Sequence, residues 1–358
     1  MHIKSLELSN YRNYKSLNIS FDENINIIFG DNAQGKTNIL ESIFLCAAAK
    51  SHRSAKNQEM IRIGSDDAHV RLVLTKKNID HKIDIHLLNG KSKKIAVDQI
   101  PIKKTGQLLG LLNAVFFSPE DLNIIKNGPS ERRKFMNLEL LMLDKVYFHD
   151  LNFYSKALDE RNKLLKQIIY DHTLESTLPV WDEKLTEYGK NVIETRERFI
   201  KEIDRHVRDI SQKVTGGKEI IETKYVPDVK KDDLRKAIED YKNYDMKTCV
   251  TNRGPHRDDI EFFIDGKSLK KFGSQGQQRT CALCLKLAEI EIVKESTGDT
   301  PVLLLDDVLS ELDRSRQNYL LDNIRNIQTL ITCTGLEEFV DSRFKVNKLF
   351  HVVNGNVE

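Results

Sequence analysis

The most informative stretch of the sequence is Gly30-Asp31-Asn32-Ala33-Gln34-Gly35-Lys36-Thr37. It fits the pattern G-x-x-x-x-G-K-[ST], and its flanks predict a buried strand leading in and an amphipathic helix leading out. Glycines let such a loop wrap a phosphate with its N–H groups pointing inward, at the positive end of the helix dipole. We predict that all eight residues bind ATP. Lys36, which we also expect to be catalytic, neutralises the β- and γ-phosphates, and Thr37 ligates Mg²⁺.

A second motif closes an apolar run, Val302-Leu303-Leu304-Leu305-Asp306-Asp307. Such a run is typical of a parallel strand buried on both faces. The two acids predict a Walker B motif, in which Asp306 holds Mg²⁺ through water and Asp307 is the catalytic residue that orients the attacking water. An exposed turn after a strand is the alternative interpretation, and the phosphate loop in the same chain argues against it. Most ATPases of the ABC class carry Glu where Asp307 stands. The shorter side chain predicts slow hydrolysis, suited to a switch.

A third motif opens a helix predicted from about 276 to 296: Phe272-Gly273-Ser274-Gln275-Gly276-Gln277-Gln278-Arg279. It resembles the ABC signature, with Gln275 in place of the first glycine. A serine hydroxyl and glycine-exposed N–H groups at a helix N-terminus form an anion site, although an ordinary capped helix has the same composition. We expect Ser274, Gly276 and Gln277 to contact ATP held by a second copy, so that two chains pair head to tail.

The segment after the acidic strand end adds to this expectation. Ser310-Glu311-Leu312-Asp313 resembles the D-loop of ABC-type ATPases, which crosses the dimer seam. We therefore include Asp313 among the nucleotide-binding residues.

Hydrophobic periodicity divides the chain into three regions. Residues 1–129 alternate as strands around one helix, and Asn89-Gly90 predicts a hairpin turn. Residues 130–248 show apolar spacings of three and four, which predict two antiparallel helices of about 35 residues and roughly 50 Å, turning near Pro179. Residues 249–358 return to an α/β pattern. The motifs resemble those of ABC/SMC-type heads, so the predicted fold is α/β: an ABC/SMC-type P-loop ATPase head, built from 1–129 and 249–358, with an inserted antiparallel helical arm at 130–248.

Composition excludes several classes of protein. Charged residues make up 31% of the chain and hydrophobic residues 39%, which suits a soluble globular protein. No apolar run is long enough for a membrane span, and the N-terminus does not resemble a signal peptide. Of the five cysteines only Cys281 and Cys284 are close together, too few for a zinc site. We expect a cytoplasmic protein. The net charge of +2 leaves a nucleic-acid partner open.

With further segments, these motifs resemble the RecF family of bacterial recombination mediators, in the SMC-like group, nearly end to end. The matching segments are Leu6-Glu7-Leu8-Ser9-Asn10-Tyr11-Arg12-Asn13-Tyr14, the loop and helix 35–41, the run 119–137, in which Asn127 stands where Gly is usual, and 304–320. The resemblance implies ATP-dependent dimerisation and binding to gapped or single-stranded DNA without sequence specificity. It also implies action with RecR and RecO in recombinational repair, replication restart and the SOS response, with a weak, DNA-stimulated ATPase as a switch.

Two departures from the general ABC pattern bear on hydrolysis. No His follows the strand predicted at 328–332, where transporters place a switch His; Thr332 and Thr334 are the candidate replacements. No Gln lies near 116–122, where a Q-loop is expected, and Ser118 and Glu120 are the candidates there. Both departures concern hydrolysis more than nucleotide binding.

Basic residues suited to DNA phosphates cluster at four places, with a solvated surface as the alternative for each. The clusters are Lys50 to Lys56, then Lys91, Lys93 and Lys94, then Lys103-Lys104, and Arg132-Arg133-Lys134. Arg53, in the first cluster, is also a candidate for contact with ATP.

Two other functions compete with this interpretation. The nucleotide-binding subunit of an ABC transporter is the first, and the helical insert and the missing switch His argue against it. A small-molecule P-loop kinase is the second. It requires a lid that binds the phosphate acceptor, and it needs no signature acting across two chains.

Overall fold

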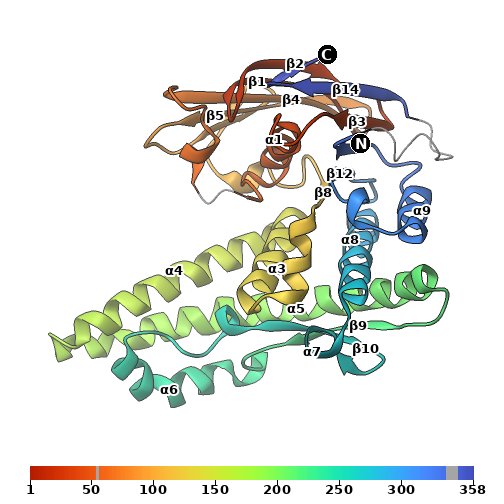
Figure 1. The fold of residues 1–358 in the computed structure, drawn as a ribbon. Helices are drawn as coiled ribbons and strands as arrows, with labels where there is room; N and C mark the ends of the chain where they lie inside the picture. The colour runs from red at the N-terminus through yellow and green to blue at the C-terminus, as the bar shows by residue number, and fades with distance from the viewer. Residues whose placement is uncertain (54–55, 336–345) are drawn as a thin grey trace. The chain divides into compact units, whose positions relative to one another are not determined.

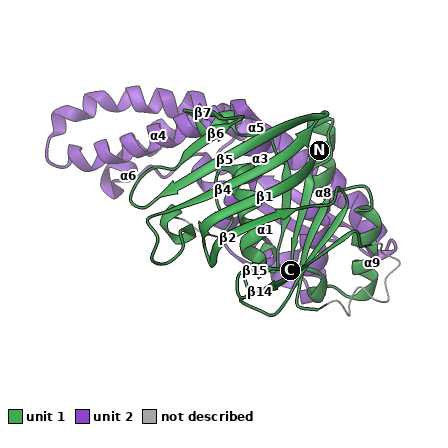
Figure 2. Cartoon of the chain, turned by 90° about the horizontal axis from the view of Figure 1, so that it is seen from above, with its two compact units in different colours: residues 1–121, 289–358 green, residues 122–288 purple. Residues whose placement is uncertain are grey.

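The computed structural model describes residues 1–53, 56–335 and 346–358. The chain forms two compact units: residues 1–121 with 289–358 (unit 1) and residues 122–288 (unit 2), coloured green and purple in Figure 2. The head and arm boundaries expected from the sequence, at 129/130 and 248/249, differ from the limits of these compact units, which do not test them, and they stay a prediction.

Unit 1 contains a largely parallel six-stranded sheet in the order β15-β14-β3-β13-β12-β8. The strands are β3 (Ile25–Phe29), β8 (Ala114–Phe117), β12 (Val302–Asp306), β13 (Thr329–Cys333), β14 (Lys348–Val353) and β15 (Asn356–Val357). Only β15 pairs antiparallel, with β14. β12 and β13 are buried along their whole length, as the continuous apolar runs predict, and the strands expected near 302–305 and 328–332 are confirmed.

A second, antiparallel sheet of unit 1 has the order β2-β1-β4-β5-β6-β7. Its strands are β1 (His2–Tyr11), β2 (Tyr14–Ser20), β4 (Asp67–Lys76), β5 (Ile79–Leu88), β6 (Lys94–Val97) and β7 (Ile100–Ile102). The predicted turn at Asn89-Gly90 joins β5 to β6, and Gly90 has the positive φ of 70° that such a turn requires. One face of β4 is buried at every second residue, which is the alternation visible in its sequence.

Helix α1 (Lys36–Ala48) contacts strands of both sheets, β4 on one side and β8, β12 and β13 on the other. It is buried on nearly every side, which explains its apolar composition from Ile39 onward. The other helices among the described residues of unit 1 are α9 (Arg314–Asn323) and four short 3-10 turns, η1 (Asn57–Met60), η2 (Thr105–Gln107), η3 (Pro119–Asp121) and η7 (Leu309–Glu311).

Unit 2 is built on two long helices, α4 (Lys145–Ile168) and α5 (Leu178–Thr215), which run side by side in Figure 1. The predicted antiparallel pair is confirmed, with Pro179 in the first turn of α5. At 24 residues α4 is shorter than expected. Asp144 starts it by accepting hydrogen bonds from Val146 N at 2.8 Å and Tyr147 N at 3.0 Å, which separates it from the preceding helix.

The other helices of unit 2 are shorter. They are α2 (Leu122–Lys126), α3 (Pro129–Leu143), α6 (Leu234–Thr248), α7 (Leu269–Phe272) and the turns η4 (His172–Thr177), η5 (Lys231–Asp233) and η6 (Pro255–Arg257). Helix α8 (Gln275–Thr297) begins in unit 2 and ends in unit 1. Among the residues that the structure describes, no helix is both long and apolar enough to cross a lipid bilayer.

A three-stranded sheet in unit 2 corrects the expectation that residues 130–248 form only helices, because one of its strands lies within that range. It has the order β11-β10-β9, with β9 (Ile221–Val226), β10 (Asp259–Ile264) and β11 (Lys267–Ser268). β9 pairs antiparallel with β10 and contacts α5. With six residues β9 is too short for its pattern to stand out from the helical segments around it, and its partner strand lies over thirty residues away. Local periodicity therefore did not reveal it.

Candidate nucleotide site

The loop between β3 and α1 has a backbone that only certain residues can form. Gly30 has φ 149°, and a Cβ there would lie 2.4 Å from the Val352 carbonyl oxygen. Gly35 has φ 115°, and a Cβ there would lie 2.4 Å from the Asn13 side chain. Ala33 is left-handed at φ 63°. Both glycines of the motif are therefore favoured by conformation, and Gly30 also by the close approach of the Val352 backbone.

The turn between β1 and β2 braces this loop. The Asn13 side chain donates to the Gln34 carbonyl at 2.8 Å and accepts from Asn38 Nδ2 at 2.8 Å, while the Tyr14 hydroxyl donates to the Gly35 carbonyl at 3.1 Å. Sequence patterns did not assign Asn13 and Tyr14 to the site, because they precede the loop by about twenty residues. Their side chains are therefore hydrogen-bonded to backbone carbonyls of the loop and hold it in place.

Lys36 lies inside the curve of the loop and is buried. Its Nζ donates to the carbonyl oxygens of Gly30 at 2.5 Å and Asp31 at 2.8 Å. Burial lowers the pKa of Lys36, and the carboxylates of Asp307 and Asp306 oppose that shift. A cation enclosed by a loop of this kind suits a phosphate anion. Asp31, Asn32 and Ala33 form the exposed outer part of the same loop.

Thr37 and Asp306 meet where the loop helix begins and β12 ends. The Thr37 hydroxyl donates to Asp306 Oδ1 at 2.8 Å, and the Thr332 hydroxyl donates to the same oxygen at 2.7 Å. Burial raises the pKa of Asp306, while the hydrogen bonds from Thr332 and Thr37 and the charge of Arg53 oppose the shift. Only 9% of Asp306 is exposed, and within the described ranges no lysine or arginine forms an ion pair with it.

This arrangement fits a magnesium ion. Mg²⁺ is usually held by one or two protein oxygens, with water and nucleotide phosphates completing its shell. The carboxylate of Asp306 and the hydroxyl of Thr37 are such a pair, and a buried carboxylate without a cation favours binding one.

Asp307 follows β12 in a left-handed conformation, at φ 53°, which Asp tolerates better than most residues. Its N–H donates to the Thr332 hydroxyl at 3.0 Å, and its carbonyl accepts from Ser310 Oγ at 2.8 Å. Thr332 is thus fully buried and hydrogen-bonded to both acids. Of the two residues proposed to replace the switch His, only Thr334 is exposed, so it remains the candidate.

The candidates for the Q-loop divide in a similar way. Ser118 is buried, and its N–H donates to Asp121 Oδ2 at 2.7 Å within a tight turn. Glu120 is exposed in the same turn. Glu120 therefore stays the better candidate for a group that reaches nucleotide.

The signature segment belongs to unit 2 and forms a capping box at the start of α8. Ser274 N donates to Gln277 Oε1 at 2.8 Å, and Gln277 N donates to Ser274 Oγ at 3.2 Å. Ser274 and Gln275 are exposed, Gly276 is half-buried, and the ring of Phe272 is 72% exposed. The serine thus faces solvent, as contact with a second chain requires.

Asp313 has a local role in unit 1. Its Oδ1 accepts from Ser315 N at 3.1 Å and Arg316 N at 3.0 Å, so it caps α9. The cap fixes the end of the D-loop-like segment 310–313.

Several cations that the sequence offers for DNA are used inside the protein. Arg132 is buried and pairs with both carboxylate oxygens of Asp259, at 2.6 and 2.8 Å. Arg133 donates to the Asp258 carbonyl at 2.8 Å. Lys93 donates to the Ala49 carbonyl at 2.5 Å, just beyond the end of α1. These three residues stabilise the fold. In the cluster from Lys50 to Lys56, residues 54 and 55 lie outside the described residues.

Comparison with known proteins gives consistent matches along the whole chain. The family model "RecF/RecN/SMC N terminal domain" matches residues 2–357. A protein of Agathobacter rectalis named "DNA replication and repair protein RecF" is 54% identical over 100% of this chain and 99% of its own. The protein of the same name from Lachnospira eligens is 53% identical, with the same coverage of both chains.

Solved structures agree. A structure of "the recombination mediator protein RecF-ATP in RecFOR pathway" superposes with a TM-score of 0.93 at 36% identity, covering 100% of this chain and 97% of that one. The structure of an SMC head bound to the C-winged helix domain of ScpA superposes with a TM-score of 0.58 at 17% identity. It covers 100% of this chain and 96% of that one, which shows the shared fold. The predicted ABC/SMC-type α/β fold is confirmed, and the transporter-subunit alternative is not favoured. The chain belongs to the RecF family of DNA replication and repair proteins.

Proposed function

We propose that this protein binds ATP with Mg²⁺ in unit 1 and that ATP joins two copies into a dimer that acts on DNA. The dimer recognises gapped or single-stranded DNA without sequence specificity. It works with RecO and RecR in recombinational repair, replication restart and SOS induction. ATP hydrolysis is slow and DNA-stimulated, and it ends the dimeric state.

One observation carries the nucleotide part of this proposal: the 2.8 Å contact between Thr37 Oγ1 and Asp306 Oδ1. It brings together two motifs that are 269 residues apart. When bound, Mg²⁺ would neutralise charge on the β- and γ-phosphates. Thr37 and Asp306 would hold the ion, Lys36 would bind phosphate, and Asp307 would orient water. Because Asp307 is a methylene shorter than Glu, we propose slow turnover.

The dimer part rests on the exposed start of α8. Ser274 has its hydroxyl at a helix N-terminus, where N–H groups and the helix dipole favour an anion. Pairing two chains head to tail gives two composite sites, each with the loop of one copy and Ser274, Gly276 and Gln277 of the other. Asp313 lies at the same seam in this proposal.

Replacing Ser274 with Arg tests the dimer directly. We expect the variant to bind ATP as the parent does but to stay monomeric, because a long cation at the helix start blocks the approach of a second chain. Size-exclusion chromatography with Mg²⁺ and a slowly hydrolysed ATP analogue measures the outcome. Ser155→Arg, an exposed serine on α4, is the matched control and should dimerise. A normal dimer peak for Ser274→Arg would disprove the composite site.

The DNA part is tested by titrating gapped, single-stranded and duplex substrates with and without ATP at two salt concentrations. Affinity for the gap should exceed affinity for duplex and should rise with ATP. Because such binding is largely electrostatic, affinity should fall steeply with salt. Equal affinity for all three substrates would contradict recognition of a gap.

A further inference from the structure

A hollow of about 540 Å³ lies on unit 2, between helix α6 and the segment that follows it. Its wall includes two aromatic rings, Tyr241 and Tyr244, two guanidinium groups, Arg253 and Arg257, and the carboxylate of Asp240. Small-molecule sites in proteins have volumes of roughly 300–1,000 Å³. The hollow is therefore large enough for a nucleotide, and it shares no residue with the nucleotide site of unit 1.

One side of the hollow has a fixed shape. Arg253 lies 4.1 Å from the centre of the Tyr241 ring, and its Nη1 donates to Asp228 Oδ1 at 3.0 Å. The N–H of Gly254 donates to the other oxygen of Asp228, also at 3.0 Å. Gly254 has φ 132°, and a Cβ there would lie 2.5 Å from the Tyr154 hydroxyl. The positive φ and the close approach both favour glycine at this position, and the hydrogen bond to Asp228 holds its backbone in place.

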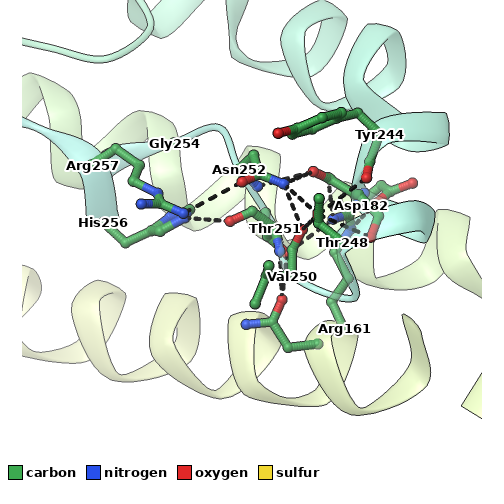
Figure 3. Close-up of polar contacts among 12 residues, drawn as sticks. Arg161, Asp182, Tyr244, Thr248, Val250, Thr251, Asn252, Gly254, His256 and Arg257 are labelled. Carbon is green, nitrogen blue, oxygen red and sulfur yellow. Dashed lines mark hydrogen bonds and ion pairs between the residues drawn. The ribbon is translucent and has the colours of Figure 1, made fainter. Parts of the chain in front are cut away.

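The segment is also anchored from below by buried charges, as Figure 3 shows. Arg161 is fully buried and donates to Asp182 Oδ1 at 2.6 Å, Asp245 Oδ2 at 2.7 Å and Thr251 Oγ1 at 2.9 Å. Asp245 in turn accepts from the N–H of Asn252 at 3.0 Å and from its side chain at 2.9 Å. Groups on the outer side of this segment are thus positioned before any ligand arrives.

The side chains on this outer side make few contacts with the rest of the protein. Tyr244 is 54% exposed and touches Tyr241 in an edge-to-face contact, with ring centres 6.0 Å apart. In the described part of the chain, neither Asp240 nor Arg257 has an ion-pair partner. Among the described residues, the Arg257 guanidinium makes one long hydrogen bond, 3.5 Å to Asn252 Oδ1 (Figure 3). An exposed ring, a cation with one long hydrogen bond and a carboxylate without an ion-pair partner among the described residues thus surround one preformed hollow.

We infer that this hollow binds a single unpaired nucleotide of a DNA strand. The Tyr244 ring stacks on the base, Arg257 binds the flanking phosphate, and Asp240 accepts a hydrogen bond from an amino group on the base edge. A base inside a duplex is stacked and paired, so it cannot enter. The inference rests on the proposed action on DNA and adds the place where the single strand is recognised.

Replacing Tyr244 tests the stack. Fluorescence anisotropy of the full-length protein measures binding to a labelled oligodeoxycytidylate strand and to a duplex of the same length. Tyr244→Ala should weaken single-strand binding about tenfold and leave duplex binding unchanged, because base–aromatic stacking is lost. Tyr244→Phe should bind as the parent does. Tyr170→Ala, which alters a tyrosine that is 90% exposed on unit 2 outside the hollow, is the matched control.

A second variant tests the phosphate contact without touching the ring. Arg257→Gln should weaken single-strand binding and lower the slope of log affinity against log salt by about 0.7, the value for one phosphate of a single strand. Parent-like binding by Tyr244→Ala or by Arg257→Gln would overturn the inference, as would an equal loss in Tyr170→Ala or on the duplex.

Two further measurements separate this inference from others. Strong competition by free deoxycytidine monophosphate would overturn it by assigning the hollow to a free nucleotide, whereas weak competition supports it. Each titration is run with and without ATP beside size-exclusion chromatography. If ATP forms no dimer, the proposed function fails in its dimer part, while the difference between Tyr244→Ala and Tyr170→Ala still decides the hollow.

Discussion

Asp306 in unit 1 and Asp258 in unit 2 are both buried carboxylates, but their surroundings differ. Asp258 pairs with Arg196 at 2.8 Å, and it accepts hydrogen bonds from the Tyr225 hydroxyl and, at 3.0 Å, from Asp228 N. Asp306 has two threonine hydroxyls and, within the residues described, no ion-pair partner. Burial raises the pKa of both groups. The first carboxylate is neutralised by the fold, and the second is left for a ligand.

This difference separates structural charges from functional ones. Unit 2 buries Arg132, Arg161 and Arg196, and each has a carboxylate within 2.8 Å. Such pairs hold strands, helices and loops together, and removing one partner leaves a buried charge. At the nucleotide site of unit 1, neither Asp306 nor Lys36 forms an ion pair with any residue that the structure describes. The cost of such groups is usually accepted only where a ligand completes them.

Breaking the unit 2 pair should give the largest effect. We expect Arg196→Met to destabilise the protein by about 3–5 kcal/mol, because Asp258 is left buried and unpaired. Urea unfolding followed by the fluorescence of Trp181, the single tryptophan, reports on unit 2. Arg198→Met, on the exposed side of the same helix, should change stability by less than about 0.5 kcal/mol. Equal losses in both variants would show that the pair has no special role.

The matching change in unit 1 should act through the ligand. Asp306→Asn removes a lone buried charge, so we expect the nucleotide-free protein to be as stable as the parent or more so. At ATP a hundred times its Kd, the parent should gain about 2.7 kcal/mol with Mg²⁺, and the variant should lose the Mg²⁺-dependent part of this gain. Thermal melts with and without Mg²⁺ measure the difference. Asp307→Asn is the control, and it should keep the Mg²⁺-dependent gain in stability. If Asp306→Asn kept the whole Mg²⁺-dependent gain, Asp306 would not be a ligand of the metal.

Glu41 sharpens the comparison within unit 1, because it is a buried acid that does have a cation. Burial raises the pKa of Glu41, but hydrogen bonds from Arg12, at 2.6 and 2.8 Å, and from Ser51 outweigh it and hold the pKa below 4.5. A lowered pKa means that its stabilisation is present above pH 4.5 and is lost as the pH falls through the folded value.

We therefore expect Glu41→Gln to lower the free energy of unfolding by about 1.5–3 kcal/mol at neutral pH. The loss should become smaller as the pH falls below 4.5. Circular dichroism melts over a pH series measure this. Glu7→Gln, in a half-exposed pair with Arg71, should cost less than about 1 kcal/mol at any pH. A cost for Glu41→Gln that is independent of pH would contradict the assignment.

The smallest effect should come from Thr332. Its hydroxyl donates to Asp306 and accepts from Asp307 N, so Thr332→Val should cost about 1 kcal/mol in the nucleotide-free protein. Thr332→Ser keeps the hydroxyl and should restore the parent stability in the same melts. A loss as large as that of Arg196→Met would mean that Asp306 depends on Thr332 as Asp258 does on Arg196.

Much of the fold was predictable because its signals are local. Each of these signals lies within one short window of sequence. They are the strand and helix around Gly35, the apolar strand before Asp306, the hairpin at Asn89-Gly90 and the helix that begins after Ser274. In every case the hydrophobic period or a turn residue is enough to define the element. Strand β9 was missed because its stability comes from β10 and α5, and neither partner is visible from its own residues.

The same reasoning divides the candidate site. Motif spacing names Lys36, Thr37, Asp306 and Asp307, because phosphate and magnesium chemistry restrict the residue types that serve. Asn13 bracing the loop and Thr332 holding both acids come from contacts between distant segments, as does the burial of Arg132 against Asp259. A sequence records which groups are present. Which charges are neutralised depends on folding, because a pair within 3 Å is set by packing and leaves no mark on the spacing along the chain.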